Sequence, residues 1–113
     1  MIETARLFSC LSDPVRLAAM LLLRREEELC VCELVVALDE NQSKVSRHLA
    51  QLRNCALVQD RRQGQWVYYK LHSDLPGWLL KALDLAAEAE AISLTLMRDR
   101  LTAMASRPER IVC

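Results

Sequence analysis

The feature that most constrains the fold is a change of hydrophobic period near residue 56. From 42 to 54, apolar side chains recur at intervals of four and three residues, which predicts one helix with a single buried stripe. Two β-prone runs follow, 57–62 and 66–71, and the second is rich in β-branched and aromatic residues. The sequence therefore predicts a helix followed directly by a β-hairpin whose turn contains Gly64.

A second, shorter helix is predicted just before this one. The apolar residues of 33–38 recur at helical spacing, and 39–41 then forms a polar turn in which Asn41 is a suitable N-cap. A short helix, a tight turn, a longer helix with a polar face and a hairpin follow the order of a winged helix-turn-helix. The predicted reading motif spans 33–54, and the predicted wing spans 57–71.

Helices are also predicted at both ends of the chain. Residues 3–10 form a short one, and Asp13-Pro14 begins another over 15–25, because Asp suits an N-cap and Pro suits the first turn. Residues 78–105 are predicted to form one long helix rich in Leu and Ala, followed by a loose tail, 106–113. The expected fold class is mainly α with a small β-hairpin.

Length and composition fit one domain spanning 1–113. The chain is 52% apolar, which is enough for a core, and pairing with a second copy would stabilise so small a domain. No apolar run approaches the ~18 residues of a membrane span, and the N-terminus does not resemble a signal peptide. We therefore expect a cytoplasmic protein with no membrane partner. In a reducing compartment, its five cysteines indicate free, metal-binding or redox-active thiols.

The net charge is zero, but the charges are unevenly distributed. Residues 41–72 carry six Lys or Arg against one Asp, a net of +5, whereas 1–40 carries four against eight and 73–113 five against six. This basic block coincides with the predicted reading motif and wing, so we expect double-stranded DNA as its partner. We expect His48 to be solvated or close to a phosphate rather than to be a metal ligand. The candidate DNA-binding residues are Gln42, Ser43, Lys44, Ser46, Arg47, His48 and Gln51 on the helix, and Arg61, Arg62 and Gln65 around the hairpin tip.

Three segments carry a family resemblance. The run 43–53, Ser-Lys-Val-Ser-Arg-His-Leu-Ala-Gln-Leu-Arg, closely resembles the recognition helix of ArsR/SmtB repressors. Residues 61–69 are similar to the wing of these repressors, and 11–17 to the start of their second helix. The resemblance implies a winged-helix transcriptional repressor that binds operator DNA. It also implies a homodimer formed through the first and last helices.

The segment 28–34, Glu-Leu-Cys-Val-Cys-Glu-Leu, resembles the inducer site of the arsenic-responsive branch of that family. The resemblance implies that Cys30 and Cys32 bind trivalent arsenic or antimony and that the repressor then leaves its operator. The branch commonly has a third cysteine where this chain has Val35. The remaining candidates for a third ligand are Cys113, which we favour because a tail can reach the site in either subunit, and Cys10 or Cys55, which are expected to be core residues.

Two thiol ligands alone do not select a single inducer ion. Thiolates select thiophilic ions over Mg or Ca. Arsenite, antimonite, methylarsenite and cadmium all remain open, and no permanently bound cofactor is expected.

The Cys-x-Cys spacing also constrains the geometry of such a site. In a regular helix, residues i and i+2 lie about 200° apart around the axis, so Cys30 and Cys32 cannot hold one ion from inside an intact helix. We therefore expect an extended or loosened segment just before Glu33. Ion binding would then tilt or fray the first helix of the reading motif.

Three other functions are considered. A zinc or nickel sensor of the same family usually has histidine ligands on its final helix, but residues 78–110 contain no histidine. A repressor of the same fold that senses oxidants through a disulfide stays open as the alternative. An enzyme would need a Cys–His pair with further catalytic elements, such as a Gly-rich loop, that the sequence does not supply, so we expect no enzymatic activity.

Overall fold

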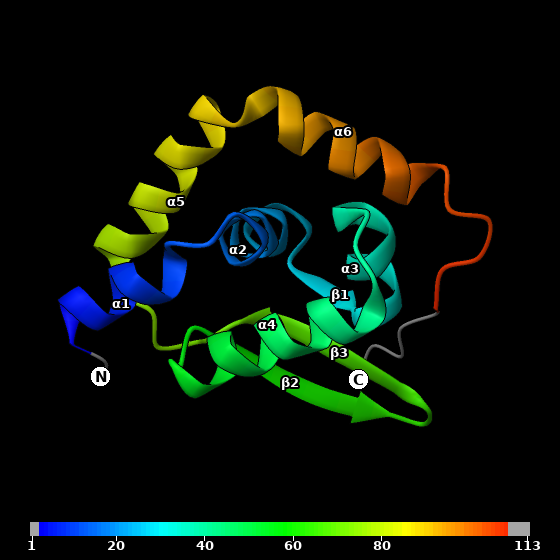
Figure 1. Ribbon diagram of the computed structural model, residues 1–113, viewed down its shortest axis with the longest axis horizontal. Helices are drawn as coiled ribbons and strands as arrows, with labels where there is room; N and C mark the ends of the chain where they lie inside the picture. Colours follow the sequence, from blue (N-terminus) through cyan, green and yellow to red (C-terminus); the bar gives the residue numbers. More distant parts are fainter. Residues whose placement is uncertain (1–2, 109–113) are drawn as a thin grey trace.

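Helix α2 lies at the centre of the fold in the computed structural model, which describes residues 3–108. In Figure 1, α5 and α6 form an arch over α2 and α3, and the strands of the hairpin lie on the opposite side with α4. The elements are α1 (Thr4–Leu11), α2 (Pro14–Glu26), β1 (Glu28–Cys30), α3 (Val31–Leu38), α4 (Gln42–Asn54), β2 (Val58–Gln63), β3 (Trp66–Leu71), α5 (Gly77–Ala89) and α6 (Ala91–Thr102).

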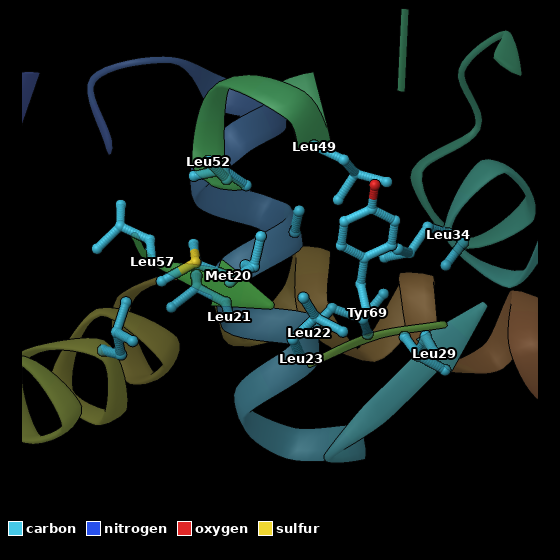
Figure 2. Packing of buried hydrophobic residues seen from close by; sticks show 14 of the residues in the cluster. Met20, Leu21, Leu22, Leu23, Leu29, Leu34, Leu49, Leu52, Leu57 and Tyr69 are labelled. Atoms are coloured by element: carbon cyan, nitrogen blue, oxygen red, sulfur yellow. The ribbon is translucent and has the colours of Figure 1, made fainter. Parts of the chain in front are cut away.

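The core is built around the end of α2. The consecutive residues from Met20 to Leu23 are each at most 1% exposed, because α2 contacts every other helix and two strands of the sheet. A helix that is apolar all round is expected only where it is enclosed on all sides. Burying each such side chain contributes about 1.5–3 kcal/mol. Figure 2 shows this run surrounded by Leu29, Leu34, Leu49, Leu52, Leu57 and Tyr69.

Helices α2 and α4 begin at the N-caps that the sequence predicts. The Asp13 carboxylate accepts hydrogen bonds from the backbone N–H groups of Val15 (2.8 Å) and Arg16 (3.1 Å) at the start of α2. Asn41 caps α4 by accepting from the backbone N–H of Lys44 at 2.8 Å. The predicted N-caps and the predicted bounds of the reading helix, 42–54, are confirmed.

The sheet has three antiparallel strands in the order β1-β3-β2. The predicted hairpin is present as β2 and β3, and Gly64 has the positive φ of 61° that its turn requires. Strand β1 was not predicted. It pairs with β3 in the register Leu29↔Tyr69 and Cys30↔Tyr68, so the segment that ends at Cys30 is part of the wing sheet.

The predicted long helix 78–105 is wrong in one respect. The chain bends at Glu90 (φ −103°, ψ 24°), which divides it into α5 and α6, and α6 ends at Thr102. The bend lets α5 pack on α2 while α6 packs mainly on α3. Buried residues continue at helical spacing across it, from Ala87 to Leu94, so the hydrophobic pattern carries no signal of the break. Within 3–108, no helix has the length and apolar character needed to span a bilayer.

Candidate functional site

Cys30 and Cys32 lie together at the junction of β1 and α3. Cys30 is the N-cap of α3 and has extended backbone angles (φ −79°, ψ 160°), whereas Cys32 lies in the first turn. The Cα atoms are 5.4 Å apart, and the two sulfur atoms are paired as a disulfide in this structure, which reduction converts to two thiols. The Sγ of Cys30 also accepts a hydrogen bond from the backbone N–H of Cys32 at 3.2 Å.

This geometry corrects the predicted start of the first motif helix. Helix α3 begins at Val31, two residues before the predicted Glu33, and stays helical through the thiol pair. The sulfurs meet because the N-cap residue has extended rather than helical backbone angles. Loosening of α3 is therefore not needed to bring the two sulfurs together.

A buried carboxylate holds the thiol pair in place. Glu33 is 0% exposed, and its Oε1 accepts a hydrogen bond from the backbone N–H of Cys30 at 2.9 Å. Its Oε2 accepts from Nε of Arg107 at 2.6 Å, so the segment after α6 is attached to the first turn of α3. Sequence reasoning missed Glu33 as a functional residue. The sequence pattern that could have identified Glu33 is the three-residue spacing of a capping box, in which Cys30 takes the place of the usual Ser or Thr.

The thiol pair faces a cavity between the reading helix and the wing. Its volume is about 410 Å³. An ion or small ligand held by the two sulfurs would thus lie beside both predicted DNA-binding elements. The cavity is lined by Cys30, Val31 and Cys32, by Gln42, Ser46 and Arg53 of α4, and by Asp60, Arg62, Gln65, Trp66, Val67 and Tyr69 of the hairpin.

The described residues bring only two thiols to this place. Val35, at the position of the family's third cysteine, is half-buried on α3. Cys10 and Cys55 pair with each other instead, and Cys113 lies outside the described residues. Across residues 3–108, no group of three or more His, Cys, Asp or Glu side chains is placed to hold a metal ion. The described part of the site therefore offers two sulfur ligands.

The N-terminal half of α4 presents its polar side chains outward. The side chains of Gln42, Ser43, Ser46 and Arg47 are exposed. Lys44 is half-buried, and its Nζ lies 3.3 Å from the Glu40 carboxylate at the end of the turn between α3 and α4. These side chains are free to approach an external surface without rearrangement of the core.

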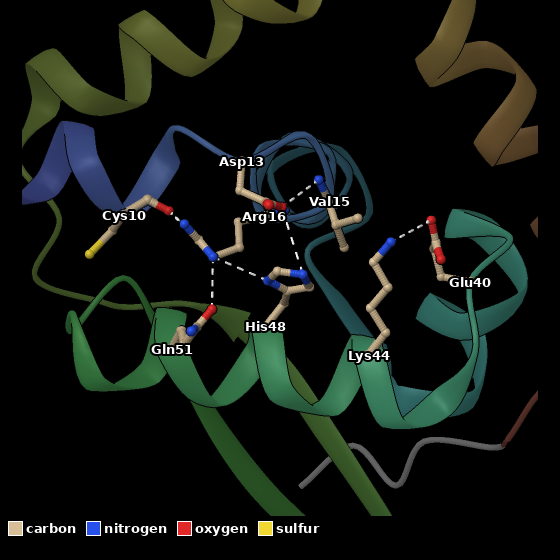
Figure 3. A network of polar contacts seen from close by, with 8 residues as sticks. All are labelled: Cys10, Asp13, Val15, Arg16, Glu40, Lys44, His48 and Gln51. Carbon is tan, nitrogen blue, oxygen red and sulfur yellow. Dashed lines mark hydrogen bonds and ion pairs between the residues drawn. The ribbon is translucent and has the colours of Figure 1, made fainter.

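His48 and Gln51 are directed toward α2 (Figure 3). The expectation that His48 is solvated is wrong, because His48 is only 8% exposed. Its Nδ1 lies 3.2 Å from Nη1 of Arg16, and its Nε2 lies 3.8 Å from Oδ1 of Asp13. Arg16 also donates from Nη1 to Gln51 at 2.7 Å and from Nε to the carbonyl oxygen of Cys10 at 2.6 Å. Arg16 thus joins the end of α1 to the middle of α4.

One pKa shift accompanies these contacts, at Asp13, and a second occurs at Tyr69 on β3. Burial acts to raise the pKa of Asp13, but hydrogen bonds from the N–H groups of Arg16 and Val15 and the charges of His48 and Arg16 outweigh it. The pKa of Asp13 is therefore lowered from its usual value of 3.8. Burial raises the pKa of Tyr69 above its usual value of 10.0.

The arginines of the wing have different surroundings. Arg61 makes two hydrogen bonds to the carboxylate of Glu28 on β1, at 2.8 and 2.7 Å, and its guanidinium lies 4.5 Å from the ring centre of Tyr68. Arg62 and Gln65 are exposed near the hairpin tip. Sequence reasoning grouped the two arginines together because it could not foresee β1 and its Glu28.

Comparison with known proteins identifies the family to which this chain is similar. The family model described as bacterial regulatory protein, arsR family, matches residues 13–60. The chain is 48% identical to the arsenic resistance transcriptional regulator ArsR1 of Pseudomonas putida over 90% of this chain and 80% of that protein. It is 49% identical to the arsenical resistance operon repressor of Escherichia coli over 75% of this chain and 73% of that protein.

Solved structures agree with these sequence matches. HlyU from Vibrio cholerae superposes with a TM-score of 0.66 and 32% identity, covering 75% of this chain and 88% of that chain. The transcriptional repressor BigR from Xylella fastidiosa superposes with a TM-score of 0.66 and 32% identity, covering 76% and 84%. The predicted winged-helix fold is confirmed, and so is the prediction that the chain is not an enzyme, because the matched family consists of transcriptional regulators. The chain belongs to the arsR family of bacterial regulatory proteins.

Proposed function

We propose that this chain is a transcriptional repressor that leaves its operator when trivalent arsenic or antimony binds Cys30 and Cys32. The observation that carries the proposal is the close approach of these two sulfur atoms at the N-cap of α3. Both cysteines line the cavity between α4 and the wing. Soft thiolate ligands favour thiophilic ions over hard cations. The names of the relatives described above, an arsenic resistance regulator and an arsenical resistance operon repressor, support the same class of inducer.

A third sulfur is proposed to come from Cys113. Arg107 is held against Glu33 beside Cys30, and Cys113 lies six positions after Arg107. An extended chain spans at most about 3.3–3.6 Å per residue, so six positions cover up to ~20 Å. That reach is sufficient for the site in the same chain. The closely related alternative is a two-sulfur site that takes a monomethylated arsenical.

The DNA-binding surface is proposed to consist of the outward side chains of α4 and the tip of the wing. Gln42, Ser43, Ser46 and Arg47 are exposed where a helix in the major groove would meet base edges. Lys44 and the N-terminus of α4 suit a phosphate. Arg62 and Gln65 are proposed to contact the backbone or minor groove. His48, Gln51 and Arg61 then act by positioning α4 and the wing, because each is held by a side chain of another element.

Inducer binding is proposed to act on both DNA-binding elements at once. Ligation of an ion would draw the Cys30 sulfur away from the backbone N–H of Cys32 and so weaken the hydrogen bond that caps the first turn of α3, and complete loss of a cap costs about 1 kcal/mol. Cys30 also lies opposite Tyr68 in the wing sheet, so its displacement acts on β3. Because coupling is reciprocal, operator DNA should weaken inducer binding by the same factor.

The active form is proposed to be a homodimer in the cytoplasm, where operator DNA is found. Phe8, Trp78, Leu85, Ile92 and Leu96 on α1, α5 and α6 are between 44% and 90% exposed, and Phe8 packs against Trp78 with ring centres 5.9 Å apart. A second copy of the chain would cover this apolar face. Exposed apolar patches of this kind mark interaction surfaces.

The proposal is tested by titrating arsenite into operator-bound protein under reducing conditions, with fluorescence anisotropy as the readout. Cys30→Ser and Cys32→Ser should each leave the protein on the operator at arsenite concentrations that release the native chain. Cys10→Ser is the matched control and should release normally. Undiminished release of the Cys30 and Cys32 variants would remove this pair from the mechanism. Release by peroxide but not by arsenite would favour the redox-sensing alternative.

A further inference from the structure

A second pair of cysteines joins two helices that are far apart in the sequence. Cys10 lies in the last turn of α1 and Cys55 follows the last residue of α4. They are 45 residues apart, their Cα atoms are 6.8 Å apart, and their sulfur atoms are bonded. Neither residue takes part in the site built on Cys30 and Cys32.

We propose that Cys10 and Cys55 form a reversible disulfide that hydroperoxides close and small thiols reopen, and that this bond holds the reading helix to α1. The inference goes beyond the response to metalloids. It assigns a separate site and a separate class of reactant, an oxidant rather than a soft ion.

The pair is open to a small oxidant. An open pocket of about 350 Å³ is lined by both cysteines and by Arg6, Ser9, Arg16, Gln51 and Asn54. Cys10 is half-buried, whereas Cys55 is 8% exposed. Cys10 is therefore the thiol that meets the oxidant first, and Cys55 is positioned to resolve the product.

The chemistry balances in two steps. The Cys10 thiolate attacks one oxygen of the hydroperoxide, the O–O bond breaks, and the products are a Cys10 sulfenic acid and an alcohol, or water if the oxidant is hydrogen peroxide. The Cys55 thiolate then attacks the sulfenic sulfur, and the hydroxyl group leaves as water. Overall, two thiols and one hydroperoxide give one disulfide, one alcohol and one water. Exchange with a small thiol reverses the reaction.

The Cys10–Cys55 bond restrains the fold in a way that the Cys30–Cys32 bond does not. The bond between Cys30 and Cys32 closes a loop of only three residues and restrains no second element. A bond between Cys10 and Cys55 joins α1 to α4. Helix α4 is then held at its middle, through His48 and Gln51 with Arg16, and at its end through Cys55.

This restraint should favour operator binding. A segment already fixed in its bound orientation loses less conformational freedom when it docks, and its affinity rises accordingly. The oxidised protein should therefore bind its operator more tightly than the reduced protein, by about threefold or more.

The test uses the full chain carrying Cys30→Ser, Cys32→Ser and Cys113→Ser, so that Cys10 and Cys55 are the only thiols. Hydrogen peroxide should remove both thiols together, as counted with a maleimide, and the intrachain bond should appear by mass spectrometry. Dithiothreitol should restore both thiols. Operator affinity, measured by anisotropy on the two forms, should be about threefold or more higher after oxidation. Because this variant lacks the metalloid ligands, the result does not depend on whether arsenite is the inducer.

Adding Cys55→Ser gives the matched control, which should form no intrachain bond and should bind the operator equally in both conditions. Oxidation of Cys10 to sulfinic acid without a bond, or a bond only between chains, would overturn the proposal. So would equal operator affinities of the oxidised and reduced forms. If circular dichroism shows that the multiple variant does not fold, peptide mapping of the peroxide-treated native chain decides the same question by showing whether a Cys10–Cys55 linkage is present.

Discussion

Arg107 donates a hydrogen bond from Nε to Oε2 of Glu33 at 2.6 Å, and the other carboxylate oxygen of Glu33 accepts from the backbone N–H of Cys30. The side chain of Glu33 is completely buried, whereas that of Arg107 is 36% exposed. A single carboxylate thus connects the segment after α6 to the residue that supplies one of the two thiols. A buried charge is costly unless it is paired, so Arg107 helps to stabilise the Glu33 carboxylate.

We expect Arg107→Ala to lower the free energy of unfolding by about 1–3 kcal/mol, because it removes a hydrogen-bonded cation from the buried Glu33 carboxylate. The affinity for the inducer should fall as well, because Glu33 orients Cys30. Adding Glu33→Gln should recover part of both losses, since a neutral amide oxygen can still accept from the N–H of Cys30. Urea denaturation and inducer titration on the single and double variants measure these effects.

The matched control for this cycle is Arg98→Ala. Arg98 pairs with Glu26 at 2.8 Å, but its side chain is 48% exposed, so its removal should cost less than about 1 kcal/mol. Purely additive effects of Arg107→Ala and Glu33→Gln would show that the two side chains are not energetically coupled.

Val35→Cys should strengthen inducer binding. Val35 lies on α3 about one turn after Cys32, and a cysteine there would add a third thiol on the same short helix. Because the added ligand is already held near the ion, we expect an affinity about tenfold or more higher for arsenite. Isothermal titration measures the change. An affinity equal to that of the native chain would indicate that the third position is already filled, and Cys113→Ser should then weaken the native site.

Arg61 and Arg62 are adjacent in sequence but should differ in function. Arg62→Ala should weaken operator binding and reduce the slope of log K against log salt by about 0.9, the loss of one phosphate contact. Arg61→Ala should mainly lower stability, because it breaks the pair with Glu28 and the contact with Tyr68. Anisotropy at several salt concentrations, combined with thermal denaturation, separates the two roles. Equal salt slopes for both variants would contradict this assignment.

Asp13 should make the protein less stable in acid. Its pKa is lower in the folded state than its usual 3.8, so the unfolded chain takes up a proton first as pH falls. The stabilisation from the ionised carboxylate is complete above the unfolded value and is lost as pH falls through the lower, folded value. Asp13→Asn keeps a capping oxygen but no charge, so its stability should fall less steeply below about pH 4. Thermal denaturation between pH 3 and 7 measures both curves, and parallel curves would argue against the shift.

Local chemistry made much of the fold predictable from the sequence. The reading helix was predicted with its correct bounds because Asn41 caps it and because its polar face contrasts with one apolar stripe. The hairpin was predictable because its strands differ in composition from every helix. The local geometry at Cys30 and Cys32 was predicted in part. Two residues at this spacing cannot bring their sulfur atoms together from inside a regular helix, so an extended segment was expected there.

Long-range pairing explains what the sequence did not predict. Strand β1 has three residues and exists because β3 lies beside it. Glu33 and Arg107 are 74 residues apart, Cys10 and Cys55 are 45 apart, and Arg16 and His48 are 32 apart. The spacing of apolar and polar residues along the sequence gives no information about contacts between residues so far apart. His48 was misplaced for the same reason, because its polar character concealed a partner on α2.

The bend at Glu90 gives the two halves of the last helical stretch different attachments. Helix α5 rests on the central helix α2, whereas α6 rests on α3, the helix whose first turn carries the thiols. A movement of α3 would therefore be passed to α6, where Ile92 and Leu96 are exposed, while α5 with Trp78 and Leu85 would stay with the core. In the proposed homodimer, ion binding would in this way change the angle between the two copies without disturbing the interior of either.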